Sequence, residues 1–169
     1  MTLRQENTNW SQSVAGVVLR GGKVLLVRHT YGVREGKLIV PGGYVLKGES
    51  PEDAVRRELM EETGVAVEPE GVLGIRFNQR DWYVAFRARY VSGMARSDRD
   101  ENSEAVWIDV DEALSRSDVP DLTRKLIACA AGGGMLSRIE YDGTLRYGPY
   151  TFYGTIGEDE EHDSAHRTV

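Results

Sequence analysis

Residues 43–65 read GYVLKGESPEDAVRRELMEETGV, a glycine-containing loop that runs into an acidic segment and ends at another glycine. Ser50 is a favourable N-cap, and Pro51 takes the first helical position, where its missing N–H costs nothing. Gly64 follows the last helical residue, where the left-handed conformation of a C-cap suits glycine. The sequence therefore predicts a helix from Pro51 to Thr63 between a loop and a turn.

Three carboxylates share one face of this predicted helix. Glu58, Glu61 and Glu62 stand at positions i, i+3 and i+4, so their side chains are neighbours. Val55 and Leu59 lie beside them on the helical wheel, which places the acids at the border of the buried side. Carboxylates at the edge of a core need a cation, and hard oxygen ligands suit Mg²⁺ or Mn²⁺. The alternative is an acidic helix face exposed to solvent.

The same stretch resembles the Nudix box, the motif of the Nudix hydrolase family. The residues that match its nine specified positions are Gly43, Glu49, Arg57, Glu58, Leu59, Glu61, Glu62, Gly64 and Val65. The resemblance implies an α/β fold, a Nudix-type α/β/α sandwich with a mixed β-sheet. It also implies a metal-dependent hydrolase that cleaves a phosphoanhydride bond in a nucleoside diphosphate linked to another moiety.

The resemblance also implies roles for residues of the motif. Glu58 and Glu62 would ligate Mg²⁺ or Mn²⁺. Glu61 would be a direct or water-mediated ligand and a catalytic residue, and the carbonyl of Gly42 would be a further ligand. Arg57 is expected to pair with Glu49 and tie the loop to the helix, although it is also a candidate for contact with the substrate. The residues with a structural role in the motif are Gly43, Glu49, Arg57 and Gly64.

One further acid is expected outside the motif. In the family that the chain resembles, an acidic residue about six positions before a tryptophan joins the metal site or activates water. Glu101 stands six positions before Trp107, and Glu104 stands three positions before it. Glu101 is therefore the preferred catalytic candidate and Glu104 the alternative.

A basic loop and several aromatic residues are candidates for substrate binding. Arg28 and Arg34 flank or lie in the loop Thr30–Gly36, where cations beside an acidic metal site would bind phosphates. Tyr44, next to the motif glycines, is a third candidate. The alternative for the arginines is scattered surface charge. The aromatic residues that could stack on a base, or simply pack in the fold, are Phe77, Trp82 and Tyr83.

Apolar, β-branched runs predict the strands. Ser13–Arg20 and Lys23–His29 are joined by Gly21-Gly22, a two-residue hairpin signal, and their continuous hydrophobicity predicts a sheet covered on both faces. The short run Leu38–Val40 leads to the motif glycines. A long hairpin is expected from Gly71–Gln79 and Trp82–Ser92, with Arg80-Asp81 at its turn.

Two further helices are expected after these strands. Val110–Ser115 predicts a short helical turn, and Leu122–Ala131 predicts an amphipathic helix that ends at three glycines and covers the sheet opposite the motif helix. Cys129, the single cysteine, lies in this helix, so an intrachain disulfide is excluded and a buried core thiol is expected.

Composition is that of an ordinary globular domain. The chain has 169 residues, of which 40% are hydrophobic and 28% charged, with a net charge of −6. Residues 157–169 contain five acids and one arginine, so the rest of the chain keeps 22 of the 27 acids and 20 of the 21 bases. A nearly neutral body does not indicate nucleic-acid or membrane binding. Without a signal-like or membrane-length apolar run, cytoplasmic localisation is expected.

The expected organisation has four parts: an N-terminal segment (1–11), a Nudix hydrolase domain (12–131), a β-hairpin-like extension (132–156) and a disordered acidic tail (157–169). The turn signal Asp142-Gly143 predicts the hairpin between Ile139–Tyr141 and Leu145–Tyr147. This segment also contains the aromatic residues Tyr147, Tyr150, Phe152 and Tyr153. It would pack on the domain, close a dimer or overhang the active site.

The motif does not identify the substrate. ADP-ribose or a nucleotide sugar is the preferred small-molecule substrate, and nucleoside triphosphates and dinucleoside polyphosphates stay open. A non-catalytic nucleotide-sensing module is the alternative to an enzyme, although no motif carboxylate is missing. A homodimer is an open option.

Overall fold

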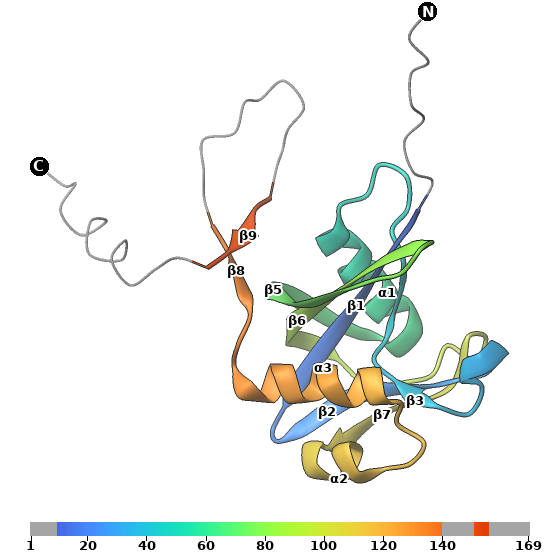
Figure 1. Ribbon diagram of the computed structural model, residues 1–169. Coiled ribbons are helices and arrows are strands. Elements are labelled where there is room, and N and C mark those ends of the chain that lie inside the picture. The colour runs from blue at the N-terminus through green and yellow to red at the C-terminus, as the bar shows by residue number, and fades with distance from the viewer. Residues whose placement is uncertain (1–9, 140–150, 156–169) are drawn as a thin grey trace, which may run out of the picture.

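The computed structural model describes residues 10–139 and 151–155 (Figure 1). In these residues one mixed sheet runs in the order β3-β2-β1-β6-β5-β8-β9, with β4 paired to β1 and β7 paired to β2. Its strands are β1 (Ser11–Arg20), β2 (Lys23–His29), β3 (Leu38–Ile39), β4 (Gly42–Tyr44), β5 (Val65–Phe77), β6 (Asp81–Gly93), β7 (Asn102–Asp109), β8 (Leu136–Arg138) and β9 (Tyr153–Gly154). The helices are α1 (Pro51–Thr63), α2 (Val110–Ser115) and α3 (Asp121–Gly132), with a 3₁₀ turn, η1 (Gly32–Arg34), after β2.

Strand β1 lies at the centre of the sheet. It pairs in parallel with β6 and antiparallel with β2 and β4, which makes the sheet mixed. Gly21 and Gly22 close the β1–β2 hairpin with φ values of 55° and 77°, the positive angles that a tight two-residue hairpin turn requires. The predicted hairpin is therefore confirmed.

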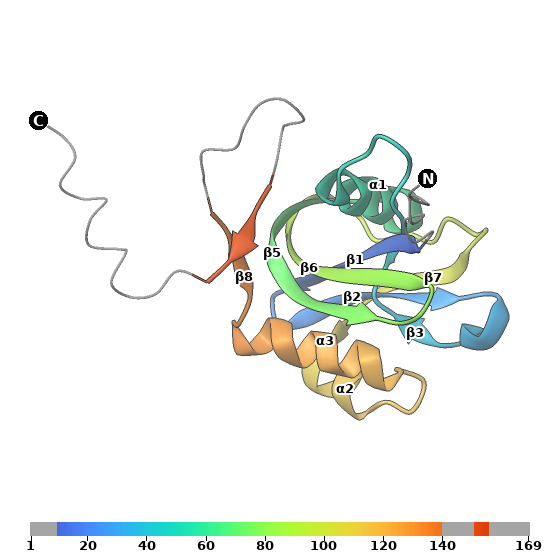
Figure 2. The same cartoon turned by 45° about the horizontal axis from the view of Figure 1, so that its top comes forward.

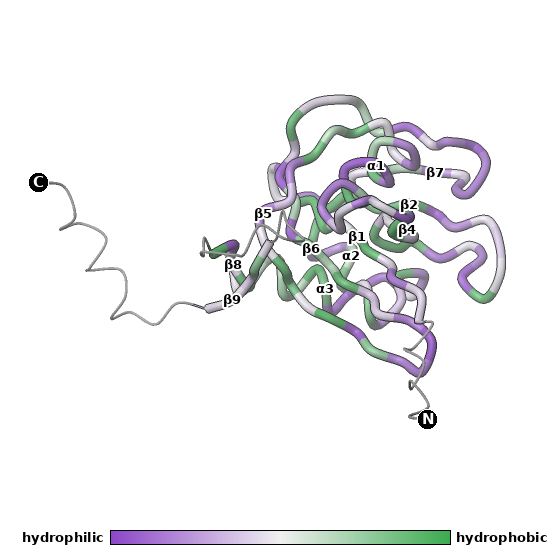
Figure 3. Tube along the Cα trace, turned by 90° about the horizontal axis from the view of Figure 1, so that it is seen from above, coloured by the Kyte–Doolittle hydropathy of each residue, from purple (hydrophilic) through white to green (hydrophobic). Residues whose placement is uncertain are grey.

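Both faces of the sheet are covered. Val14 and Val18 of β1 pack with apolar side chains of α1, whereas Ala15 and Val17 point to the other face and pack with those of α2 and α3. Figure 2 shows α1 on one side of the sheet and α2 and α3 on the other. This arrangement is the predicted α/β/α sandwich. In Figure 3 the hydrophobic stretches follow the central strands and helices, while the loop before β7 is hydrophilic.

Helix α1 has the predicted bounds because its caps are local. The hydroxyl of Ser50 accepts a hydrogen bond from the Asp53 N–H at 3.1 Å. Gly64 adopts the left-handed conformation with φ 69°, and its N–H donates to the Met60 carbonyl at 2.9 Å. These caps fix where the acidic face begins and ends.

Two sequence expectations need correction. Strand β5 begins at Val65, directly after α1, and not at Gly71; register shifts on either side of Pro69 break the period-2 pattern that marks a strand. Cys129 is exposed, not buried. The buried face of α3 is formed by Thr123, Leu126, Ile127 and Ala130, and Cys129 lies outside it.

The described part of the C-terminal extension packs on the domain. Strand β8 pairs with β5 and β9 pairs with β8, which adds both strands to the sheet edge. The Tyr153 ring makes an edge contact with Phe86 at 5.8 Å between centroids, and its hydroxyl donates to Glu52 Oε1 at 2.8 Å. The predicted Asp142-Gly143 turn and the acidic tail lie outside the described residues. None of the described helices is long and apolar enough to cross a membrane.

Candidate active site

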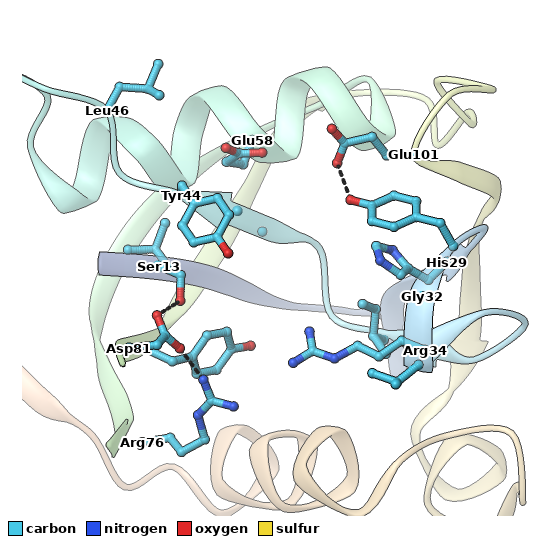
Figure 4. A pocket seen from close by; sticks show the side chains of 17 residues that line it. Ser13, His29, Gly32, Arg34, Tyr44, Leu46, Glu58, Arg76, Asp81 and Glu101 are labelled. Atoms are coloured by element: carbon cyan, nitrogen blue, oxygen red, sulfur yellow. Dashed lines mark hydrogen bonds and ion pairs between the residues drawn. The ribbon is translucent and has the colours of Figure 1, made fainter. Parts of the chain in front are cut away.

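A cavity of about 550 Å³ opens beside the acidic face of α1 (Figure 4). Glu58 and Glu101 line one wall, and Arg34, Arg76 and Asp81 line the wall that faces them. In Figure 4 labelled side chains around this space come from α1, from the loops after β2 and before β7, and from the ends of the central strands. The pocket therefore brings together segments that lie far apart in the sequence.

Glu62 is the most deeply buried acid beside this pocket. It is 5% exposed, and its Oε2 accepts a hydrogen bond from the Gly42 N–H at 3.0 Å. Burial, together with the nearby carboxylates of Glu58 and Glu101, raises the pKa of Glu62 to about 8. Among the ion pairs of the described residues, none includes Glu62. A buried carboxylate without a counter-charge is costly, and a bound cation would relieve that cost.

Glu58 stands against the glycine turn. Burial raises the pKa of Glu58, although Arg57 Nη1, 2.7 Å from its Oε1, acts in the opposite direction. A Cβ atom added to Gly43 would lie 2.5 Å from the Glu58 carboxylate. A larger residue at this position would displace the carboxylate from its observed place, so Gly43 lets Glu58 lie directly against strand β4.

Arg57 joins the loop of the motif to its helix. It donates to both carboxylate oxygens of Glu49, at 2.8 and 3.0 Å, and to the Tyr44 carbonyl at 2.9 Å. Its Nη1 also lies 3.2 Å from Glu61, whose side chain is 61% exposed. Arg57 is therefore held by the loop and by the acidic face.

The two candidate acids before Trp107 have different surroundings. Glu101 lines the pocket, and its Oε2 accepts a long hydrogen bond of 3.4 Å from the Tyr31 hydroxyl (Figure 4). Glu104 instead accepts from Arg28 Nε at 2.8 Å and does not line the pocket. The structure therefore brings Glu101, and not Glu104, together with the acids of α1.

The candidate substrate-binding residues also differ in whether they line the pocket. Arg34 and Tyr44 line the pocket, and the Arg34 guanidinium points into it (Figure 4). Arg28 lies outside the pocket, where it pairs with Glu104 and with Asp118 at 3.1 Å. Of the aromatic candidates, only Tyr83 lines the pocket. Phe77 and Trp82 pack on each other with centroids 5.0 Å apart.

Sequence reasoning missed two groups of residues. Asn102 is 1% exposed, and its Nδ2 donates to the Glu62 carbonyl at 2.9 Å, which holds the start of β7 against the end of α1. Ser13, Arg76 and Asp81 form the wall opposite Glu58. No local pattern marks these residues, because the pairing of strands that are distant in sequence brings them together.

The acids form a set of hard oxygen donors suited to a divalent cation. In the described residues no group of three or more His, Cys, Asp or Glu side chains is arranged as a metal site, because Arg57 draws Glu58 and Glu61 toward itself while Glu62 bonds to Gly42. The buried Glu62 carboxylate, which forms no ion pair in the described residues, and the nearby Glu58 carboxylate are oxygen donors that fit a divalent cation. The residues therefore fit Mg²⁺ or Mn²⁺.

Comparisons with known proteins agree with this geometry. A family model described as the NUDIX domain matches residues 10–128. A MutT-like protein of Streptomyces ambofaciens is 37% identical over 109 residues, which cover 63% of this chain and 68% of that protein. The NAD-capped RNA hydrolase NudC of Actinobacillus succinogenes is 35% identical over 113 residues, covering 60% and 41%. The ADP-ribose pyrophosphatase of Methanocaldococcus jannaschii is 36% identical over 63 residues, covering 37% of each chain. The chain thus spans about two fifths of the length of the last two relatives.

Solved structures show the same fold. A NUDIX hydrolase from Nitrosomonas europaea superimposes with a TM-score of 0.68 at 27% identity, over 80% of this chain and 99% of that one. An ADP-ribose pyrophosphatase from Streptococcus suis superimposes with a TM-score of 0.58 at 22% identity, over 72% and 90%. The chain belongs to the Nudix hydrolase family, and it is an enzyme of that family.

Proposed function

We propose that this chain hydrolyses a phosphoanhydride bond in a nucleoside diphosphate linked to another moiety, with Mg²⁺ or Mn²⁺ as cofactor. The observation that carries the proposal is the buried carboxylate of Glu62, which forms no ion pair among the described residues and lies near Glu58, a residue that lines the pocket. Glu58 and Glu62 would hold the metal, and Glu61 and the Gly42 carbonyl would complete its protein ligands. When bound, the metal supplies positive charge to the diphosphate oxygens and lowers the pKa of water.

The other pocket residues take distinct parts in the reaction. The Glu101 carboxylate orients a water molecule and accepts its proton as the water attacks phosphorus, and the Tyr31 hydroxyl holds Glu101 in place. Arg34 faces the acids from the other wall and binds phosphate oxygens. Asn102 keeps the loop that carries Glu101 against the end of α1.

The relatives support a nucleotide-linked substrate. Two relatives are named for ADP-ribose and for NAD-capped RNA, and each of these compounds contains a nucleoside diphosphate joined to a further group. ADP-ribose or a nucleotide sugar is therefore the first choice. A nucleoside triphosphate pyrophosphohydrolase is the second candidate, and one relative, of which the chain covers 68%, is named a MutT-like protein.

The same proposal includes the division of the chain. Residues 12–131 form the hydrolase domain, and 132–156 form an extension to it. The family match over 10–128 supports this boundary, and the pairing of β8 with β5 supports an extension that adds to the sheet edge.

A substrate panel tests the proposed reaction. Phosphate or nucleoside monophosphate release would be measured with ADP-ribose, nucleotide sugars, dinucleoside polyphosphates and nucleoside triphosphates, with Mg²⁺, with Mn²⁺ and with a chelator. We expect metal-dependent turnover of a nucleoside diphosphate compound, and Glu101→Gln to lower kcat by about 10²–10⁴-fold. Glu104→Gln is the matched control and should leave kcat within about twofold, because Glu104 pairs with Arg28 outside the pocket. Metal-independent activity, or equal loss in both variants, contradicts the proposal.

A further inference from the structure

The wall that faces the acids is a built polar surface. Ser13 Oγ donates to Asp81 Oδ1 at 2.9 Å, and Arg76 Nη2 donates to Asp81 Oδ2 (Figure 4). These residues come from β1, β5 and β6, three neighbouring strands of the sheet. The Asp81 side chain is 18% exposed and lines the pocket. Its carboxylate is therefore fixed in direction while one side stays open to a ligand.

The surroundings hold this carboxylate rigidly. The Arg76 guanidinium lies over the Tyr83 ring, 5.1 Å from its centroid. Burial raises the pKa of Tyr83 to about 12, so the phenol stays neutral and does not compete with Asp81 for Arg76. Side chains locked by packing and by two hydrogen bonds are typical of groups that bind a ligand in one geometry.

The chemistry of the wall selects the kind of group it can bind. An ionised carboxylate accepts about four hydrogen bonds in total, and Ser13 and Arg76 use two of them. The remaining acceptor positions repel phosphate and attract hydroxyl donors. A vicinal diol offers two such donors side by side. Arg34, whose guanidinium has no ion pair or hydrogen bond among the described residues, lines the same pocket and suits the adjoining phosphate.

We propose that Asp81 accepts hydrogen bonds from the vicinal hydroxyls of a ribose in the substrate, so that this enzyme prefers ribonucleotide compounds to their 2′-deoxy counterparts. The inference rests on the proposed function for the position of the diphosphate. It adds a specificity residue that faces the acids and takes no part in bond cleavage. An interaction between a hydroxyl and a partly buried carboxylate separates the two substrate classes by about tenfold to a hundredfold.

The test measures binding and turnover separately. Calorimetry on the metal-free protein compares ADP-ribose with its 2′-deoxy and 2″-deoxy analogues, and steady-state kinetics with Mg²⁺ compares the same compounds and the pair ATP and dATP. For the unchanged protein we expect at least about tenfold weaker binding and lower kcat/KM for one deoxy analogue. In Asp81→Asn the ribose-to-deoxy ratio should fall to about one, through KM more than kcat.

Two further variants separate recognition from a purely structural role. Ser13→Ala frees one side of the carboxylate and should reduce the ribose preference partially. Glu68→Gln breaks an ion pair with Arg56, 2.7 Å long and outside the pocket, and should leave the preference unchanged. The proposal is overturned if Asp81→Asn lowers the melting temperature but keeps the preference, or if the unchanged protein does not bind ADP-ribose at millimolar concentration. Intact binding preference without turnover would instead contradict only the proposed reaction.

Discussion

Helix α1 contains two buried glutamates with opposite surroundings. Glu52, in the first turn, is 7% exposed, and its Oε1 accepts a hydrogen bond from the Tyr153 hydroxyl at 2.8 Å. Glu62, in the last turn, is 5% exposed and has other carboxylates as neighbours. The helix dipole favours negative charge at the first turn and disfavours it at the last. Glu52 is therefore placed where a carboxylate stabilises the fold, and Glu62 where it destabilises the fold unless a cation binds.

This difference shows how to tell a structural acid from a ligand on one helix. Burial alone does not separate the two glutamates. Their partners do, because Glu52 accepts from a neutral donor of the C-terminal extension, whereas Glu62 accepts from a single backbone N–H and has three acids nearby, Glu58, Glu101 and Asp98. The comparison makes predictions about activity, metal binding and stability.

The largest expected effect concerns turnover. Glu62→Gln should lower kcat by about a hundredfold or more, because the amide cannot supply the negative charge that a metal needs. Glu52→Gln, an equally small change on the same helix, should keep kcat within about twofold. Phosphate release measures both, and circular dichroism checks that both variants fold. Equal activity in Glu62→Gln and the unchanged protein would remove Glu62 from the metal site.

Metal-dependent stabilisation should follow the same division. Mg²⁺ or Mn²⁺ at 100 times its Kd stabilises the folded state by about 2.7 kcal/mol, which raises the melting temperature of a chain of this size on the order of 5–10 °C. Glu52→Gln should show this rise, and Glu62→Gln should show little of it. Thermal melts with and without metal measure the difference. If neither metal changed the melting temperature of the unchanged protein, the acidic face would not bind a metal ion.

At the other end of the helix, the expected effect is on stability and not on catalysis. Tyr153→Phe should lower the free energy of unfolding by about 1–3 kcal/mol, because Glu52 Oε2 has no hydrogen-bond partner among the described residues and Oε1 would lose its own. Urea unfolding measures the loss.

Tyr31→Phe, which removes the hydroxyl that donates to Glu101, should show the reverse pattern, with lower kcat and nearly unchanged stability. If Tyr153→Phe and Tyr31→Phe lost similar amounts of stability and of kcat, the distinction between a structural Glu52 and a functional acidic face would be wrong.

The smallest effect is expected at Asp118, a carboxylate that is already paired with arginine side chains. Asp118 accepts from Arg116 at 2.8 and 2.9 Å and from Arg28 at 3.1 Å, and these hydrogen bonds hold the pKa of Asp118 well below its usual value. Its stabilising contribution is therefore complete above about pH 4, the pKa in the unfolded chain, and is lost as pH falls through the lower folded-state pKa. Asp118→Asn should melt earlier than the unchanged protein at pH 7, with the gap closing in acid. A gap that widens as pH falls would reverse this assignment.

Local signals in the sequence were sufficient to predict α1. Contacts between residues that are distant in the sequence could not be predicted in this way. Ser50, Pro51 and Gly64 define that helix within one turn of each end, so its bounds were predicted correctly. The burial of Glu52 depends on Tyr153, 101 residues away in the sequence, and could not be read from the helix.

Strand register explains the other differences. Which of Glu101 and Glu104 lies at the pocket depends on how β7 pairs with β2. In this pairing Arg28 lies opposite Glu104, and the register shifts between Arg28 and His29. The wall of Ser13 and Asp81 depends on the parallel pairing of β1 with β6. Periodicity predicts that a strand exists, but it does not predict which neighbour the strand takes.

The parallel pairing of β1 with β6 also bears on how the chain acquires its shape during synthesis. The contact between Ser13 and Asp81 joins residues 68 positions apart, and the strands around it meet across comparable separations. Closing such long loops slows folding, and β1 has to wait for a partner that leaves the ribosome much later. The hairpin of β1 with β2 protects one edge of the early strand in the meantime. Pausing of translation before β6 would therefore prolong an aggregation-prone state in which the wall of Ser13 and Asp81 has not formed.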